Sequence, residues 1–130
     1  MSVNTTSHGH TVSVYIKPKP MNWIELTSES QLSDIVAVSE TQPVIVFKHS
    51  TRCSISVAAK GRLERQWNFA DNEITAYYLD LLNYRSISNK IADDFQVHHE
   101  SPQLLLIRNG ECTYVEAHSG ITVQDLREHL

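Results

Sequence analysis

Cysteine is scarce in this chain, and its scarcity narrows the class of protein. Only two of the 130 residues are cysteines, Cys53 and Cys112, too few for the disulfide framework of a small secreted domain. The first six residues, MSVNTT, carry neither the basic nor the apolar segment of a secretory signal peptide. We therefore predict a cytoplasmic protein, whose reduced cysteines are more often catalytic than structural.

Long apolar runs and positive charge are lacking too. No apolar run approaches the roughly 20 residues of a membrane span, so no membrane association is predicted. The net charge is −4, and no basic cluster is longer than Lys17-Pro18-Lys19, which argues against nucleic acids and anionic membranes as main partners. Hydrophobic residues make up 41% and charged residues 20% of the chain, an ordinary composition for one globular domain with a genuine core.

The N-terminal residues differ in composition from the rest of the chain. Residues 1–20 are rich in Ser, Thr, His and Lys and end in Pro18-Lys19-Pro20. Apolar residues alternate with other residues over 12–16, which predicts either a flexible arm or a short edge strand. The folded domain is predicted to cover residues 21–130.

From residue 21 onward, strand and helix patterns alternate. The continuous apolar run 44–47 is typical of a strand buried on both faces of a sheet. Ile55, Ala59, Leu63 and Trp67 recur every four residues, as in an apolar helical stripe. The predicted strands are 23–26, 44–47, 74–82, 103–108 and 112–117, and the predicted helices cover about 32–39, 54–67, 86–95 and 123–130.

Local signals support these boundaries. Ser28 and Gln31 are spaced as a capping box before the first helix, and Thr122 to Asp125 is predicted to cap the last one. Asn109-Gly110 predicts a two-residue hairpin. The order β-α-β-α-β-α-β-β-α implies an α/β fold, in which helices cover both faces of a largely parallel sheet and the last hairpin adds an antiparallel pair.

Cys53 is the most informative residue. It follows the apolar strand and opens a helical segment, so its thiol is expected at a helix N-terminus, where free N–H groups and the dipole favour a thiolate. The thiolate is the reactive nucleophile, and Arg52 adds a second favourable charge. Ser56, not a cysteine, stands three residues on, which favours one-thiol chemistry. The polar flanks Thr51 and Ser54 argue against the alternative, a buried and inert cysteine.

Two histidines are candidates for tuning this thiol. His49 lies four residues before Cys53, and His99 lies shortly before Pro102; each is alternatively a structural or surface residue. A zinc site made of Cys53, His49 and His99 would lack conventional ligand spacing, so no metal is predicted. A Cys–His acyl-transfer pair would need an oxyanion hole and an orienting group that the sequence does not reveal.

The element order, with a cysteine after the second strand and Ser101-Pro102 before the hairpin, resembles the thioredoxin fold, a three-layer α/β/α arrangement around a mixed sheet. More narrowly, the sequence is similar to the YtxJ-like family, the monothiol bacilliredoxins. Ser54 departs from the family, because many members carry proline there. The segments that carry the resemblance are 48–56 (KHSTRCSIS), 97–103 (VHHESPQ), 84–85 and 88–92.

The resemblance implies a monothiol thiol-disulfide oxidoreductase that removes bacillithiol, or a similar small thiol, from protein mixed disulfides. Cys53 is the catalytic residue, Pro102 is expected to be cis, and the backbone of Ser101 is expected to pair with the substrate chain. The implied partners are S-thiolated proteins and a small-thiol co-substrate, with no other cofactor. The implied thiol-tuning or substrate-contacting residues are Thr51, Arg52, Ser54, Ser56, His49, His99, Ser101 and Pro102.

Cys112 tests the monothiol prediction. It begins the return strand after a strand of about six residues, roughly 20 Å from the Pro102 end. A disulfide needs Cα atoms within about 7 Å, so Cys112 is predicted to be a packing residue that does not resolve Cys53. Two other functions stay open, a non-catalytic binding module and a redox sensor, both using the Cys53/Pro102 cleft. No oligomeric state is predicted.

Overall fold

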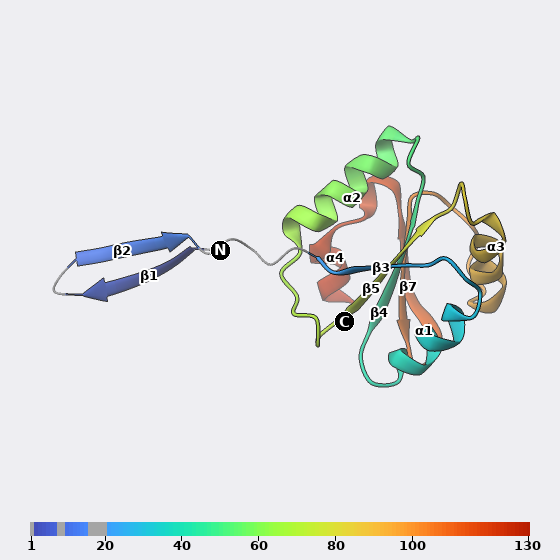
Figure 1. Cartoon of the computed structure of the whole chain (residues 1–130), viewed down its shortest axis with the longest axis horizontal. Helices are drawn as coiled ribbons and strands as arrows, with labels where there is room; N and C mark the ends of the chain where they lie inside the picture. The colour runs from blue at the N-terminus through green and yellow to red at the C-terminus, as the bar shows by residue number, and fades with distance from the viewer. Residues whose placement is uncertain (1, 8–9, 16–20) are drawn as a thin grey trace.

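The structure is a computed structural model that describes residues 2–7, 10–15 and 21–130 (Figure 1). Strands β1 (Ser2–Ser7) and β2 (His10–Tyr15) form an antiparallel hairpin in which Ser2 lies opposite Tyr15. Neither strand joins the main sheet. The alternating residues of the predicted arm therefore pair locally as far as residue 15, and residue 16 lies outside the described residues.

The main sheet has five strands in the order β3-β5-β4-β6-β7. The first three in this order are parallel, and β6 is antiparallel to both of its neighbours. The mixed sheet and its element order confirm the predicted α/β fold class. The strands are β3 (Trp23–Glu25), β4 (Val44–His49), β5 (Thr75–Asp80), β6 (Gln103–Arg108) and β7 (Glu111–Ala117).

Helices cover both faces of this sheet. The helices are α1 (Gln31–Ser39), α2 (Ser54–Gln66), α3 (Arg85–Asp94) and α4 (Val123–Glu128), with a short 3₁₀ helix η1 (His118–Gly120) after β7. One core cluster contains the apolar residues of α1 and α3, and a second contains those of α2 and α4. The sheet therefore lies between two helical layers (Figure 1).

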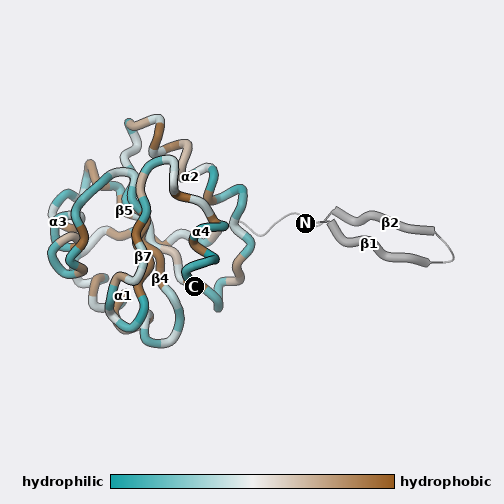
Figure 2. The backbone as a smooth tube through the Cα atoms, turned by 180° about the vertical axis from the view of Figure 1, so that it is seen from behind, coloured by the Kyte–Doolittle hydropathy of each residue, from teal (hydrophilic) through white to brown (hydrophobic). Residues whose placement is uncertain are grey.

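Strand β4 is the centre of the molecule, and all six of its residues are buried. Val44 and Val46 belong to the core cluster on the α1/α3 face, whereas Ile45 and Phe47 belong to the cluster on the α2/α4 face. The hydrophobic colouring in Figure 2 marks this central strand. Because side chains alternate along a strand, Lys48 belongs to the α1/α3 face and His49 to the α2/α4 face. The prediction of a strand buried on both faces is confirmed.

The predicted stripe on α2 is wrong at its first residue. Ala59, Leu63 and Trp67 are buried, but Ile55 is 53% exposed. Each step of four residues rotates about 40° past a full helical turn. Two such steps separate Ile55 from Leu63, so the Ile55 side chain points away from the face that Leu63 buries. Ser56, which is fully buried, occupies the inner face of the first turn instead.

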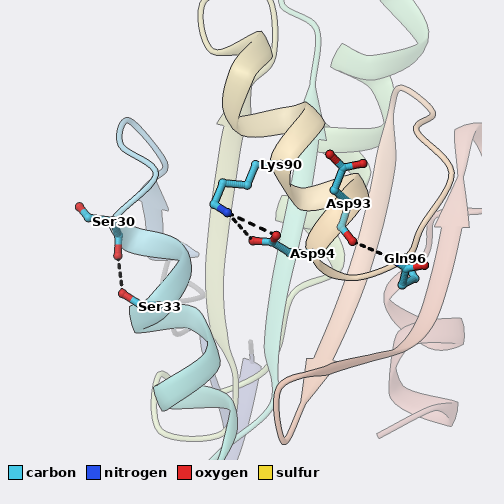
Figure 3. Close-up of polar contacts among 6 residues, drawn as sticks. All are labelled: Ser30, Ser33, Lys90, Asp93, Asp94 and Gln96. Carbon is cyan, nitrogen blue, oxygen red and sulfur yellow. Dashed lines mark hydrogen bonds and ion pairs between the residues drawn. The ribbon is translucent and has the colours of Figure 1, made fainter.

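The predicted cap of α1 is also wrong. The helix begins one residue after Ser30, and the Ser28 hydroxyl pairs with the Ser30 hydroxyl rather than with a helix N–H. Half of the capping box is present, because Gln31 Oε1 accepts hydrogen bonds from the N–H groups of Thr27 and Ser28. Figure 3 shows the first turn of α1, where the Ser33 hydroxyl donates to the Ser30 carbonyl.

Candidate active site around Cys53

Cys53 lies where β4 passes into α2. Its backbone is extended (φ −103°, ψ 120°), it is the N-cap of the helix, and its carbonyl accepts a hydrogen bond from the Val57 N–H at 3.0 Å. The thiol is free and partly exposed, and no other described residue forms a hydrogen bond with its sulfur. A helix N-terminus stabilises negative charge on a group placed there. The predicted position of the thiol is confirmed, and its sulfur is available for reaction.

Three loops meet at the Cys53 edge of the sheet. Parallel pairing places His49, at the end of β4, beside Asp80, at the end of β5. Antiparallel pairing places Lys48 beside Gln103, the first residue of β6. The β4–α2, β5–α3 and α3–β6 loops therefore share one edge, as expected where the connections of an α/β sheet diverge from neighbouring strands.

A buried histidine and serine brace the Cys53 loop from beneath. His49 Nδ1 lies 2.7 Å from Ser56 Oγ, and the same oxygen accepts a hydrogen bond from the Ser50 N–H at 3.0 Å. The serine hydroxyl can donate to Nδ1 or accept a second hydrogen bond from it, and the imidazole tautomer sets which of the two atoms donates. Burial lowers the pKa of His49, and the charge of Lys60 lowers it further, so a neutral ring is favoured. Ser56 is a structural link in this loop, where a resolving cysteine would otherwise stand.

A second polar cluster lies under the neighbouring loop; it joins His99 to Lys48, to which the sequence analysis did not assign a role. Lys48 is fully buried, and its Nζ donates to the Ser88 carbonyl at 3.1 Å and contacts His99 Nδ1 at 3.2 Å. No carboxylate of the described residues lies within ion-pair distance. Burial lowers the pKa of Lys48 to about 8. The sequence could have predicted the burial of Lys48, because this residue directly follows the apolar run of a strand that is buried on both faces.

His99 covers this lysine. Its pKa is lowered first by burial and then by the charges of Lys48, His98 and Arg85, so the neutral ring is favoured and its Nδ1 can accept a hydrogen bond from the ammonium. The Ser88 hydroxyl also lies near this nitrogen, at 3.3 Å. His99 is therefore held by Lys48 and Ser88, and it is not hydrogen-bonded to Cys53.

The loop before β6 carries the predicted cis bond, and the Ser101–Pro102 peptide is cis. Gln103 anchors this loop, because its Nε2 donates to the His98 carbonyl at 2.9 Å. Within the described part of the chain, the N–H and C=O of Ser101 form no hydrogen bond, and its buried hydroxyl has no partner. The loop thus presents an unpaired stretch of backbone beside the cis-proline.

Comparisons with known proteins agree with this arrangement. Residues 24–126 match the family of the monothiol bacilliredoxin BrxC. This chain belongs to the monothiol bacilliredoxin family. It is also similar to a thioredoxin-fold protein assigned as an oxidoreductase, with 31% identity and a TM-score of 0.72 over 82% of this chain and 92% of the other. Family and relative together support a thiol redox function.

More distant similarities concern the fold alone. Thioredoxin from Malassezia sympodialis matches with 14% identity and a TM-score of 0.67, over 88% of this chain and 92% of that one. Thioredoxin from Trypanosoma brucei brucei matches with 14% identity and a TM-score of 0.64, over 89% and 94%. The predicted thioredoxin-like fold is confirmed.

The second cysteine of this family member lies at the other end of the sheet. Cys112 pairs with Ile107, which in turn pairs with Val44 at the start of β4, whereas Cys53 follows the end of β4. Five strand steps separate these ends, about 17 Å at 3.3 Å per residue. The Cys112 thiol packs against the α1/α3 core cluster, and burial raises its pKa. It is out of reach of Cys53 in this structure.

The predicted site residues occupy two adjoining loops. Thr51, Arg52 and Ser54 are exposed around Cys53, while Ser101 and Pro102 lie across the sheet edge. Ile55 and Val57, exposed by 53% and 52%, add apolar surface to the first turn of α2 that the sequence analysis missed. Two further findings come from the described residues alone: no three metal-ligating side chains cluster, and no helix has the length and apolarity to cross a membrane.

Proposed function

We propose that this protein removes a low-molecular-weight thiol, bacillithiol or a similar molecule, from mixed disulfides on other proteins. The observation that carries the proposal is a single accessible thiol at a helix N-terminus, with Ser56 at the resolving position and the second cysteine at the opposite end of the sheet. A reducing compartment such as the cytoplasm is part of the proposal, because the reaction needs free thiols.

Two exchange steps complete the cycle. The Cys53 thiolate attacks the sulfur of the small thiol, so that a Cys53 mixed disulfide forms and the protein substrate leaves as a thiolate, which takes a proton from water. A second small thiol, as its thiolate, then attacks the small-thiol sulfur of this adduct. Cys53 is released as a thiolate, and the oxidising equivalents leave as the disulfide of the small thiol.

The protein substrate has a surface to bind beside Cys53. The unpaired N–H and C=O of Ser101 suit strand-like pairing with an extended substrate segment. The exposed side chains of Ile55 and Val57 suit apolar residues that flank the modified cysteine. Both features support a protein, rather than a free small disulfide alone, as the thiolated substrate.

Intact-mass spectrometry tests this proposal directly. Reduced protein is mixed with a test protein that carries bacillithiol on one cysteine, and both masses are followed with time. We expect a bacillithiol-sized adduct on Cys53 together with a free thiol on the test protein. Cys53→Ser should abolish the transfer, and the matched control Cys112→Ser should leave it largely intact. Equal loss in the two variants would contradict the monothiol mechanism.

A further inference from the structure

A small pocket opens between the β4–α2 and β5–α3 loops, next to Cys53 in the sequence. It has a volume of about 310 Å³ and is lined by Thr51 and Arg52 of the β4–α2 loop and by Leu82 and Asn83 of the β5–α3 loop. Small-molecule sites begin at roughly 300 Å³, so the pocket suits a fragment rather than a peptide. Its wall includes the residue immediately before Cys53, and consecutive Cα atoms are about 3.8 Å apart. The pocket therefore begins one residue from the reactive cysteine.

The N–H donors of the Arg52 guanidinium have no acceptor among the described residues. Arg52 is exposed, and nothing in the described ranges accepts a hydrogen bond from it or forms an ion pair with it. Asn83, by contrast, is held, because its Nδ2 donates to Asp80 Oδ2 at 2.7 Å. That bond satisfies one oxygen of the Asp80 carboxylate, which does not line the pocket and whose Oδ1 is buried without a partner among the described residues. An anionic ligand would thus meet an unpaired arginine and an amide already fixed in position.

The surrounding charges are mainly cationic, although the whole chain carries a net charge of −4. Arg85 begins α3, two residues after the pocket lining ends, and its charge reaches the adjacent His99. Lys48 acts on the same histidine from below. Asp80 and Glu100 are the two carboxylates among these residues, against the three cations Arg52, Arg85 and Lys48. The balance of one positive charge favours an anionic ligand at this edge.

We propose that this pocket binds a carboxylate of the small thiol, with Arg52 as its direct ligand and Arg85 as a second cation at its rim. The inference rests on the proposed function and adds a specificity to it, because small thiols that carry a carboxylate are expected to exchange with Cys53 faster than those that lack one. A guanidinium pairs with a carboxylate through two parallel hydrogen bonds. A small thiol with a free carboxylate near its sulfur, such as N-acetylcysteine, suits a cation on the residue next to Cys53, whereas a thiol whose cysteine carboxyl is an amide must bring a carboxylate from elsewhere in the molecule.

Alkylation of Cys53 tests the pocket without any disulfide substrate. Iodoacetate and iodoacetamide modify the thiol by the same reaction, and only iodoacetate carries a carboxylate. We expect Arg52→Gln to lower the ratio of the iodoacetate rate to the iodoacetamide rate by about two- to fivefold, the upper part of the range for an exposed ion pair. Comparing ratios between variants removes the intrinsic difference between the reagents.

Arg65→Gln is the matched control. Arg65 is exposed on α2, eleven residues beyond Ser54, about 17 Å along the helix, and its replacement changes the net charge equally. We expect this control to keep the wild-type ratio and Arg52→Lys to recover part of it. An unchanged ratio in Arg52→Gln, or an equal fall in Arg65→Gln, would overturn the proposal.

A second arm separates this proposal from the proposed function. A test protein carries either N-acetylcysteine or its amide as a mixed disulfide, and transfer to Cys53 is followed by mass. We expect the preference for the acid to fall by a similar factor in Arg52→Gln. If wild type transfers neither group but still shows the alkylation preference, the transfer function fails and the pocket stands. Equal transfer of both groups, with ratios unchanged in Arg52→Gln, refutes the pocket and leaves the function intact.

Discussion

The two ends of the β4–β6 ladder each carry one cysteine, but they bury different kinds of side chain. Of the described buried polar residues, only Ser39 lies at the Cys112 end, where its hydroxyl accepts the Gly110 N–H at 2.8 Å and fixes the hairpin turn. The Cys53 end buries five polar side chains. The buried polar residues at the Cys53 end are Lys48, His49, Ser56, Ser88 and Gln103.

The difference in buried polar side chains indicates a different role for each end of the sheet. Burying a polar group costs free energy unless it is hydrogen-bonded, so each buried polar group must be matched to a partner. The Cys112 end uses one such group to close a turn. The Cys53 end uses several to hold two loops around a reactive thiol, so its buried polar groups fix the arrangement of those loops.

Ser56→Cys would give the Cys53 end a partner thiol, which neither end has in the wild-type protein. Residues at an N-cap and three positions on lie close together, within the Cα distances that a disulfide accepts. We expect the oxidised variant to lose two hydrogens by forming a disulfide between Cys53 and the introduced thiol, and to release its small-thiol adduct without a second small thiol. Mass spectrometry under mild oxidation measures both. Cys53 and Cys112 of the wild-type protein, treated identically, should form no intramolecular bond.

Paired serine variants would compare the two polar arrangements directly. Ser56→Ala leaves the Ser50 N–H without its acceptor, and Ser39→Ala does the same to the Gly110 N–H. We expect each to lower the free energy of unfolding by about 1–3 kcal/mol, measured by urea denaturation. Only Ser56→Ala should also slow transfer to Cys53, since it releases His49 and Ser50 beneath the thiol loop. Equal transfer rates would show that the Ser56 brace stabilises the fold without positioning the loop.

Lys48 allows a pH test of the Cys53 end. Its folded-state pKa of about 8 lies below the ordinary lysine value of 10.5, so the unfolded chain binds more protons between these values and stability rises with pH there. From about pH 7 to about pH 9.5 we expect wild type to gain about 2 kcal/mol relative to Lys48→Met, at ~1.4 kcal/mol per pKa unit. Urea denaturation of both proteins at the two pH values measures this gain.

The comparison with Lys48→Met removes the contributions of other groups that titrate in this range. Burial raises the pKa of Cys112 and of Tyr77, but both residues are present in the two proteins. At neutral pH the methionine variant should be at least as stable as wild type, because it removes a desolvated charge. Parallel stability curves would mean that Lys48 is not desolvated as its burial indicates.

Much of this fold was predictable, and the failures have a common physical cause. The run Val44–Phe47 and the turn Asn109-Gly110 carry local signals that one segment contains in full. Ile55 and Ser28 were assigned wrongly because helix phase depends on how the first turn packs against the sheet. Lys48 was missed as a buried group because its partners, Ser88 and His99, are 40 and 51 residues away in the chain, and no local pattern encodes such contacts.

Ser54→Pro is the smallest change that sharpens the comparison. Ser54 is the first residue of α2, where proline is favoured because the N–H has no helical partner. Cys53 is extended, the conformation that a residue before proline prefers. We expect the unfolding free energy to rise by about 0.4–1 kcal/mol through a less flexible unfolded chain. Val57→Pro is the control, because its N–H donates to the Cys53 carbonyl and its loss should destabilise the helix start. If Ser54→Pro is stabilising and transfer is unchanged, the serine hydroxyl beside the thiol has no part in the reaction; slower transfer would assign that hydroxyl a role in holding the small thiol.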